Sequence, residues 1–115
     1  MNDKPWHIDN PQNCPMVGAI NVIGGKWKPV ILHMLSSRTM RFGEIKKNIP
    51  PISQKMLTQQ LRELEADGVV LRTVYPEVPP KVEYSLTKYG ATLRPILDGL
   101  YEWGEKHAGS KKARR

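Results

Sequence analysis

Cysteines, acidic residues and long apolar runs are scarce in this chain, and each scarcity excludes a class of protein. Among 115 residues there is a single cysteine, Cys14, so no disulfide can form within one chain. No apolar run approaches the roughly 20 residues that a membrane helix needs, and residues 1–5 lack the charged and apolar regions of a signal peptide. We therefore expect a cytoplasmic protein without a membrane partner, in keeping with the reducing compartment that one free cysteine suits.

Patterns for metal binding and catalysis are also missing. The three histidines, His7, His33 and His107, have no metal-ligand spacing with one another or with Cys14. There is no phosphate-binding loop, no dinucleotide-binding glycine pattern and no nucleophile–base–acid set. The pair Gly24-Gly25 is too short to cradle a phosphate and is better explained as a break between two helices. We predict no enzymatic activity, no cofactor and no metal.

The shortage of acidic residues leaves a basic chain. Lysines and arginines outnumber aspartates and glutamates by 18 to 11, for a net charge of +7, which favours a polyanionic partner such as nucleic acid. Four of these charges lie at the C-terminal end, where a solvated, disordered tail explains them equally well: Lys111, Lys112, Arg114 and Arg115. Placement within residues 42–86 is more informative, since six cations gather there: Lys46, Lys47, Lys55, Arg62, Arg72 and Lys81.

The segment Ile52–Gly68 has the pattern of an amphipathic helix. Three leucines recur at helical spacing on one stripe: Leu57, Leu61 and Leu64. The opposite side carries Lys55, Thr58, Gln59 and Arg62. Ser53 can cap the first turn, and Gly68 suits the left-handed residue that ends a helix. An ordinary surface helix would share this pattern, so the neighbouring segments decide its meaning.

Those neighbours predict a helix-turn-helix. Phe42–Asn48 reads as a short helix with Phe42 and Ile45 facing inward. Pro50 and Pro51 then stop it, because proline lacks a backbone donor and biases the residue before it toward extended geometry. Two helices joined by a tight turn, the second polar on its outer face, form the helix-turn-helix of DNA-binding proteins.

A β-ribbon follows these helices. Residues Val69–Tyr75 are rich in β-branched side chains, and apolar residues alternate with polar ones at Val82, Tyr84 and Leu86. The prolines of residues 76–81 stiffen a connection that is too long for a two-residue turn, so it should project as a loop. Helix, turn, helix and a two-stranded ribbon with a protruding tip make up a winged helix-turn-helix.

Further helices are expected at both ends. Pro15–Ile23 can form the first helix. Trp27, Ile31 and Met34 line one face of a second, in which Pro29 is tolerated only in the first turn. Thr87 is expected to cap a single final helix, bent at Pro95, with an apolar stripe of Leu93, Ile96, Leu97, Leu100 and Trp103.

These terminal helices allow two interpretations. Either they pack on their own domain, or they pair with a second subunit across a two-fold interface. We favour the second, because one small winged domain reads a palindromic site best as a symmetric dimer. The expected fold is thus mainly α with a small β-wing, dimeric through the terminal helices. We expect an N-terminal arm at residues 1–13, the domain at 14–107 and a basic flexible tail at 108–115.

In combination, these segments resemble the HxlR-type family of bacterial transcription regulators, which are relatives of the MarR family. The resemblance runs from about Cys14 to Trp103 and is carried by Gly24–Trp27, Ile52–Thr58, Leu61, Leu64-Glu65, Asp67-Gly68 and Val82–Thr87. It implies a dimeric winged helix-turn-helix that binds operator DNA. Lys81 stands where the wing of many relatives has arginine, and a lysine is a point charge without arginine's planar fork.

The expected mechanism places two copies of the Ser53–Ala66 helix in successive major grooves, about 34 Å apart. On that helix, the predicted DNA-binding residues are Ser53, Gln54, Lys55, Thr58, Gln59 and Arg62. Glutamine suits adenine, whereas arginine and lysine suit guanine. Lys81, at the tip of the wing, should meet the DNA backbone or minor groove with help from Arg72. Each of these residues could instead be an ordinary solvated side chain.

Cys14 is the remaining candidate site. It precedes Pro15, where a helix should start, and a helix N-terminus favours the thiolate, which can be oxidised, capped by a small thiol or alkylated. A protein disulfide would have to join the Cys14 residues of two subunits. Cys14 could equally be a small buried hydrophobe, but family members often carry a Cys-Pro pair here and several sense oxidants or electrophiles.

Two functional hypotheses remain. The first is a sequence-specific repressor that binds a palindromic double-stranded DNA operator as a homodimer and responds to an oxidant, an electrophile or a small-molecule inducer. The second is a winged-helix module for protein–protein interaction that does not read DNA sequence. Steep salt dependence of duplex binding would favour the first, because phosphate contacts release counterions.

Overall fold

The structure, a computed structural model, describes residues 13–113, with side chains described as far as residue 109. The elements in chain order are α1 (Pro15–Ile23), α2 (Lys28–Ser37), β1 (Met40–Arg41), α3 (Phe42–Asn48), α4 (Gln54–Ala66), β2 (Val70–Tyr75), β3 (Lys81–Leu86), α5 (Lys88–Ala91) and α6 (Arg94–Ala113). The fold is mainly helical with a small antiparallel wing, as predicted. No helix in the described part of the chain is both long and apolar enough to cross a bilayer.

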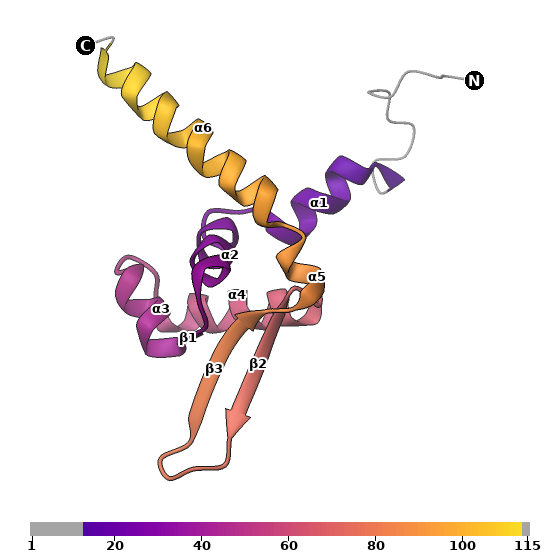
Figure 1. Cartoon of the computed structure of the whole chain (residues 1–115), viewed down its shortest axis with the longest axis vertical. Coiled ribbons are helices and arrows are strands. Elements are labelled where there is room, and N and C mark those ends of the chain that lie inside the picture. The colour runs from indigo at the N-terminus through magenta and orange to yellow at the C-terminus, as the bar shows by residue number, and fades with distance from the viewer. Residues whose placement is uncertain (1–12, 114–115) are drawn as a thin grey trace.

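The elements form a body from which three parts project (Figure 1). Helices α2, α3 and α4 lie together with the base of the sheet. The ribbon of β2 and β3 extends from one end of this body, and α1 and α6 diverge from the opposite end. The predicted arm, residues 1–13, lies almost wholly outside the described residues. Helix α6 continues to Ala113, so the described part of the expected tail is helical; the domain boundaries stay predictions.

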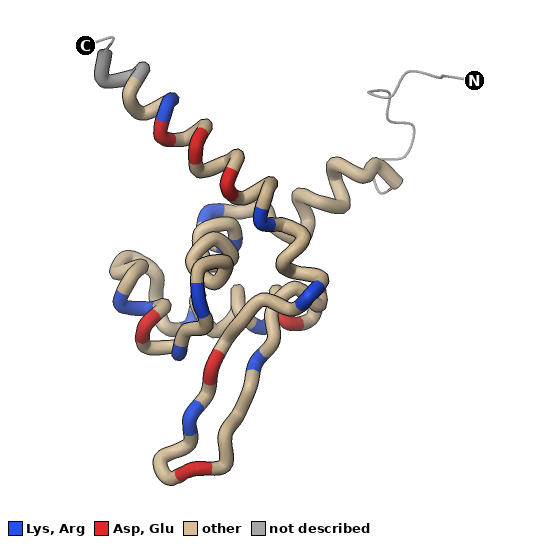
Figure 2. The backbone as a smooth tube through the Cα atoms, viewed as in Figure 1, with Lys and Arg blue, Asp and Glu red and all other residues tan. Residues whose placement is uncertain are grey.

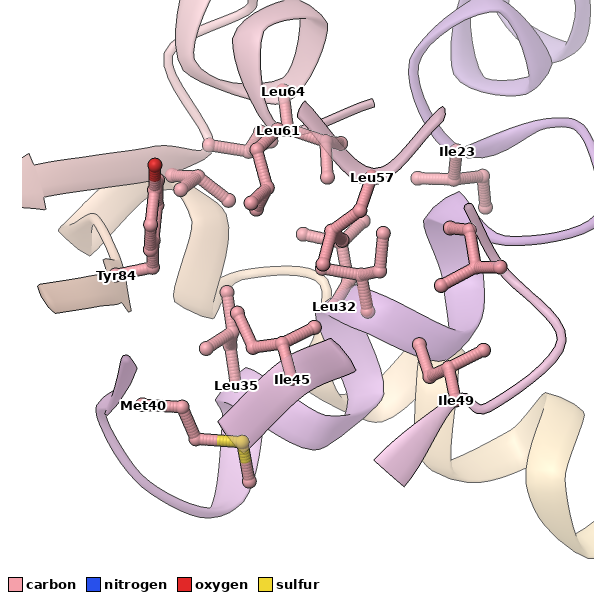
Figure 3. Close-up of a cluster of buried hydrophobic side chains, with 14 of the residues drawn as sticks. Ile23, Leu32, Leu35, Met40, Ile45, Ile49, Leu57, Leu61, Leu64 and Tyr84 are labelled. Carbon is pink, nitrogen blue, oxygen red and sulfur yellow. The ribbon is translucent and has the colours of Figure 1, made fainter. Parts of the chain in front are cut away.

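One hydrophobic core holds the body together (Figure 3). The predicted leucine stripe of α4 supplies its centre, because Leu57, Leu61 and Leu64 are all buried. Leu32 and Ile45 come from α2 and α3 and point into the same cluster. Full burial of one such side chain is worth about 1.5–3 kcal/mol relative to leaving it in water. The core therefore fixes which face of α4 is left outside.

Local signals set the ends of α4 where the sequence predicts them. The hydroxyl of Ser53 accepts a hydrogen bond of 3.0 Å from the backbone N–H of Met56, which satisfies a donor that the first turn would otherwise leave unpaired. At the other end, Gly68 has a φ of +77°, which is unfavourable for residues with a side chain. The Val69 N–H then donates to the carbonyl of Leu64 at 3.2 Å and closes the helix.

The sheet has one strand more than the sequence predicts. Its order is β1-β3-β2 and all pairs are antiparallel. The predicted ribbon of β2 and β3 is present, with Arg72 paired to Tyr84 and Tyr75 to Lys81. Strand β1 adds only two residues, with Met40 opposite Tyr84. Two residues cannot show an alternating pattern, so this strand could not be detected from periodicity.

The expected single bent helix after Thr87 is wrong, because the chain forms two helices there. Thr87 does act as a cap, accepting from the Gly90 N–H at 2.8 Å, but the helix that it caps is the short α5. Helix α6 starts afresh at Arg94, which puts Pro95 in its first turn. A proline inside a continuous helix would remove a hydrogen bond and clash with the preceding turn, whereas the first turn tolerates it.

Candidate nucleic-acid interface

The outer face of α4 brings five of the predicted DNA-binding residues together. Because the three leucines turn inward, the polar side chains opposite them face solvent. They line an open groove of about 770 Å³ along the helix, together with Glu63 and Ala66: Gln54, Lys55, Thr58, Gln59 and Arg62. A helix with such a polar, partly cationic outer face has the dimensions and chemistry that suit a DNA major groove.

A second groove joins this face to the sheet. It measures about 430 Å³, and Arg72 of β2 lines it together with Gln54, Thr58 and Arg62 of α4. The sequence predicted Arg72 only as a helper of the wing. The structure instead places it beside the reading helix, so Arg62 and Arg72 contribute two cations to one groove.

Several side chains on this face already have partners within α4. The Thr58 hydroxyl donates to the Gln54 carbonyl at 2.9 Å, and the Gln59 amide nitrogen donates to Glu63 at 3.1 Å. Ser53 accepts the capping hydrogen bond from the Met56 N–H, which uses its hydroxyl oxygen and not its hydroxyl proton. Lys55 and Arg62 are exposed and extend into the solvent-filled groove.

The wing carries its cations along the strands (Figure 2). Lys81 is the first residue of β3, next to the loop at the tip, and it is partly buried. Its ammonium lies 3.6 Å from a Glu83 carboxylate oxygen and 4.9 Å from the centre of the Tyr75 ring. A hydrogen bond with Glu83 raises the pKa of Tyr75 above its usual 10.0. The loop itself contains Glu77, so the tip is acidic and Lys81 is the cation nearest to it.

Sequence reasoning missed one charged pair that supports this face. Lys28, at the start of α2, is only 8% exposed, and its ammonium lies 2.7 Å from Glu63 of α4. Hydrogen bonds from Lys28 and then from Gln59 hold the pKa of Glu63 below its usual 4.5. A lysine at a helix start is ordinarily solvated, so the sequence alone carried no signal for this pair.

Cys14 occupies the position that the sequence predicts. It is the N-cap residue of α1, with Pro15 in the first turn, and its carbonyl accepts from the Gly18 N–H at 3.0 Å. The residue as a whole is partly exposed. Within the described residues, no group of three or more histidine, cysteine and acidic side chains is arranged to hold a metal ion.

Helices α1 and α6 expose large apolar side chains. Of the predicted stripe on the last helix, Leu97 is buried and Leu93 packs against the core. The other three remain on the surface, as does Tyr101 of the same helix, and α1 exposes two more. The set is Met16, Ile20, Ile96, Leu100, Tyr101 and Trp103. Scattered apolar residues are normal on a protein surface, but a set on two projecting helices indicates an interaction surface.

Comparisons with known proteins agree with this architecture. The HxlR-like helix-turn-helix family model matches residues 22–112. The HTH-type transcriptional regulator YdeP of Bacillus subtilis (strain 168) is 52% identical over 102 residues, which are 89% of this chain and 80% of YdeP. The redox regulator HypR, in its oxidised form, is 54% identical with a TM-score of 0.79, covering 81% of this chain and 96% of that of HypR.

A third relative is the transcriptional regulator YodB from B. subtilis, in its reduced form. It is 40% identical with a TM-score of 0.70, and the match covers 81% of this chain and 92% of that of YodB. The residues that the family model matches include the helix-turn-helix, the wing and most of α6. The chain belongs to the HxlR-like helix-turn-helix family, whose members are transcriptional regulators rather than enzymes.

Proposed function

We propose that this regulator is a repressor that binds a two-fold symmetric DNA operator as a homodimer in the cytoplasm. The observation that carries the proposal is the outer face of α4, where polar and cationic side chains line one groove and an adjoining second groove adds Arg72. Phosphate contacts alone would give binding without sequence preference. The glutamines among these residues add groups that can distinguish base edges.

Each part of this surface has a proposed role. Gln54 and Gln59 can accept from and donate to the edge of an adenine, while Lys55 and Arg62 suit the acceptors of guanine. Thr58 and Arg72 lie within the same groove and can contact bases or phosphates beside the helix. Lys81 reaches the backbone or minor groove next to the wing, and Ser53 contributes chiefly by fixing the first turn of α4.

The exposed apolar side chains of α1 and α6 support a homodimer. Covering the half of Leu100 that is still exposed is worth about 1 kcal/mol, and the set contains several such residues. A second copy of the same two helices offers a complementary surface under two-fold symmetry. Sedimentation at micromolar concentration should show a dimer, and a monomer would contradict this part of the proposal.

Selection from a random duplex library, at fixed salt and under reducing conditions, tests the reading of DNA. Sequencing of the retained duplexes should give a symmetric motif with half-sites about one helical turn apart. Gln59→Ala should relax the preference at defined bases, whereas Lys81→Ala should weaken all sequences alike. Generic, salt-sensitive retention without a motif would contradict the proposal and favour the protein–protein interaction module.

We further propose that Cys14 senses oxidants or electrophiles. Its partly exposed place at the N-terminus of α1 supports this, and HypR, a relative with 54% identity, is a redox regulator. Since the chain has one cysteine, oxidation joins the Cys14 residues of two subunits or modifies each singly. Binding to the selected operator, measured with and without oxidant, should respond in the parent protein. An equal response in Cys14→Ser would refute the assignment.

A further inference from the structure

Lys28 is the only buried charged residue within residues 13–109. Burial of a charge costs several kcal/mol unless the charge is paired and hydrogen-bonded. Its partner is Glu63, which lies on a different helix and lines the groove of the reading face. The pair therefore connects the start of α2, just after the turn from α1, to the surface that is proposed to meet DNA.

The carboxylate of Glu63 uses its two oxygens for two different neighbours. One oxygen lies 2.7 Å from the Lys28 ammonium, and the other accepts from the Gln59 amide nitrogen at 3.1 Å. The lowered pKa of Glu63 indicates that it stays ionised. Gln59 is thereby held from one side by a carboxylate that is itself fixed by a buried cation.

The chemistry of these groups determines which way the Gln59 amide faces. An ionised carboxylate only accepts hydrogen bonds, so the amide NH₂ must face Glu63 and the amide oxygen must point elsewhere. One N–H of Gln59 is then used, while the second N–H and the oxygen remain available. A bidentate contact with adenine uses the amide oxygen and one N–H, so a hydrogen bond from the other N–H to Glu63 is compatible with it.

We propose that Lys28 is a specificity-determining positioning residue, which acts through Glu63 to hold the Gln59 amide in the orientation that reads an adenine edge. The inference rests on the proposed function, in which Gln59 meets a base. Lys28 itself touches no DNA in this arrangement. Its second effect is to neutralise a carboxylate that would otherwise repel nearby phosphates, which changes affinity for every sequence alike.

These two effects separate in one experiment. The selected operator is replaced by a set of duplexes in which every base pair is changed singly, and dissociation constants are measured for the full-length protein at one salt concentration. Gln59→Ala first identifies the base pairs that this residue reads. Lys28→Met, which keeps the buried volume but removes the charge, is then compared at those base pairs, with thermal unfolding confirming that each variant is folded.

The chain offers a matched control and a second route to the same contact. Lys26 is exposed, and its ammonium lies over Trp27, so Lys26→Met removes the same charge close by without touching Glu63. Glu63→Ala approaches the contact from its partly exposed end, but it leaves the buried Lys28 ammonium without this partner, so thermal unfolding must confirm that this variant is folded as well. Glu63→Ala also removes the negative charge, whereas Lys28→Met leaves the Glu63 carboxylate without the cation that neutralises it.

Lys28→Met and Glu63→Ala should both lose about tenfold discrimination, and at the same base pairs as Gln59→Ala, since a good base contact is worth roughly 5- to 150-fold. General affinity should fall in Lys28→Met but not in Glu63→Ala, and Lys26→Met should keep the parent profile. A parent-like profile in Lys28→Met or Glu63→Ala would overturn the inference while leaving the proposed function intact. Failure of the parent protein to select a motif would instead overturn the proposed function.

Discussion

Replacement of Gly90 by alanine should destabilise the protein, although alanine is normally the better residue in a helix. Gly90 is buried in α5 against the backbone of Val69. A Cβ at Gly90 would overlap the Val69 carbonyl oxygen and lie 2.9 Å from its carbonyl carbon. Both are backbone atoms of a tightly connected segment, so neither can rotate away as a flexible side chain would.

The magnitude follows from two opposing contributions. Overpacking of a buried site costs about 1–3 kcal/mol, and the upper end applies because backbone must move. The gain in helix propensity from glycine to alanine returns about 1 kcal/mol. The free energy of unfolding should therefore fall by about 2 kcal/mol, which is a large part of the total of about 5–15 kcal/mol for a protein of this kind.

Urea denaturation followed by circular dichroism measures this change, with all variants at one protein concentration because dimerisation would affect the midpoint. Gly43→Ala is the matched control, since a Cβ at this exposed position of α3 meets nothing within 4 Å. It should leave the free energy of unfolding unchanged or raise it by up to about 1 kcal/mol. Equal or greater stability of Gly90→Ala would refute the steric argument.

Three further changes test the fold by urea denaturation. Ser53→Ala should cost about 1 kcal/mol through the lost cap of α4, and an unchanged midpoint would contradict that role. Leu61→Ala should cost about 2–5 kcal/mol, because a cavity replaces a buried side chain; a smaller loss would mean that the core collapses around it. For Glu44, hydrogen bonds from the Arg41 N–H and then from Arg38 lower the pKa below 4.5. The contribution of Glu44 to the free energy of unfolding is therefore complete above pH 4.5 and is lost as the pH falls through the lowered pKa. The stability difference between the parent and Glu44→Gln should accordingly shrink in acid, and a difference independent of pH would contradict this.

The elements that sequence predicts well are those whose signals are local. Ser53, the leucine stripe and Gly68 define α4 within a single segment, and the structure shows the cap, the buried face and the positive φ that they predict. The bounds of α1 and α3 also match the expected ones. In α4 the cap, the hydrophobic periodicity and the terminating glycine all indicate the same helix, and tertiary packing agrees with them.

The features that were missed depend on partners far along the chain. Strand β1 exists because Met40 meets Tyr84, and two residues carry no pattern of their own. Lys28 can be buried because Glu63 of another helix forms an ion pair with its ammonium. The break before α6 is a different case, since Pro95 was visible in the sequence and only its consequence, a new helix instead of a bend, was misjudged. Strand β1 and the burial of Lys28 thus depend on long-range contacts, which local sequence patterns do not specify.

The contact around Gly68, Val69 and Thr87 also affects which spacing between operator half-sites the protein can accept. The Thr87 hydroxyl donates to the Gly68 carbonyl at 2.6 Å and its N–H to that of Val69 at 3.1 Å, so the end of α4 is tied to the start of α5. In the proposed dimer, the distance between the two reading helices is then determined by the geometry of the dimer interface. One extra base pair at the centre of an operator rotates one half-site relative to the other by about a tenth of a turn. Because the hydrogen bonds of Thr87 fix the end of α4 to α5, the reading helix cannot easily turn to match that rotation.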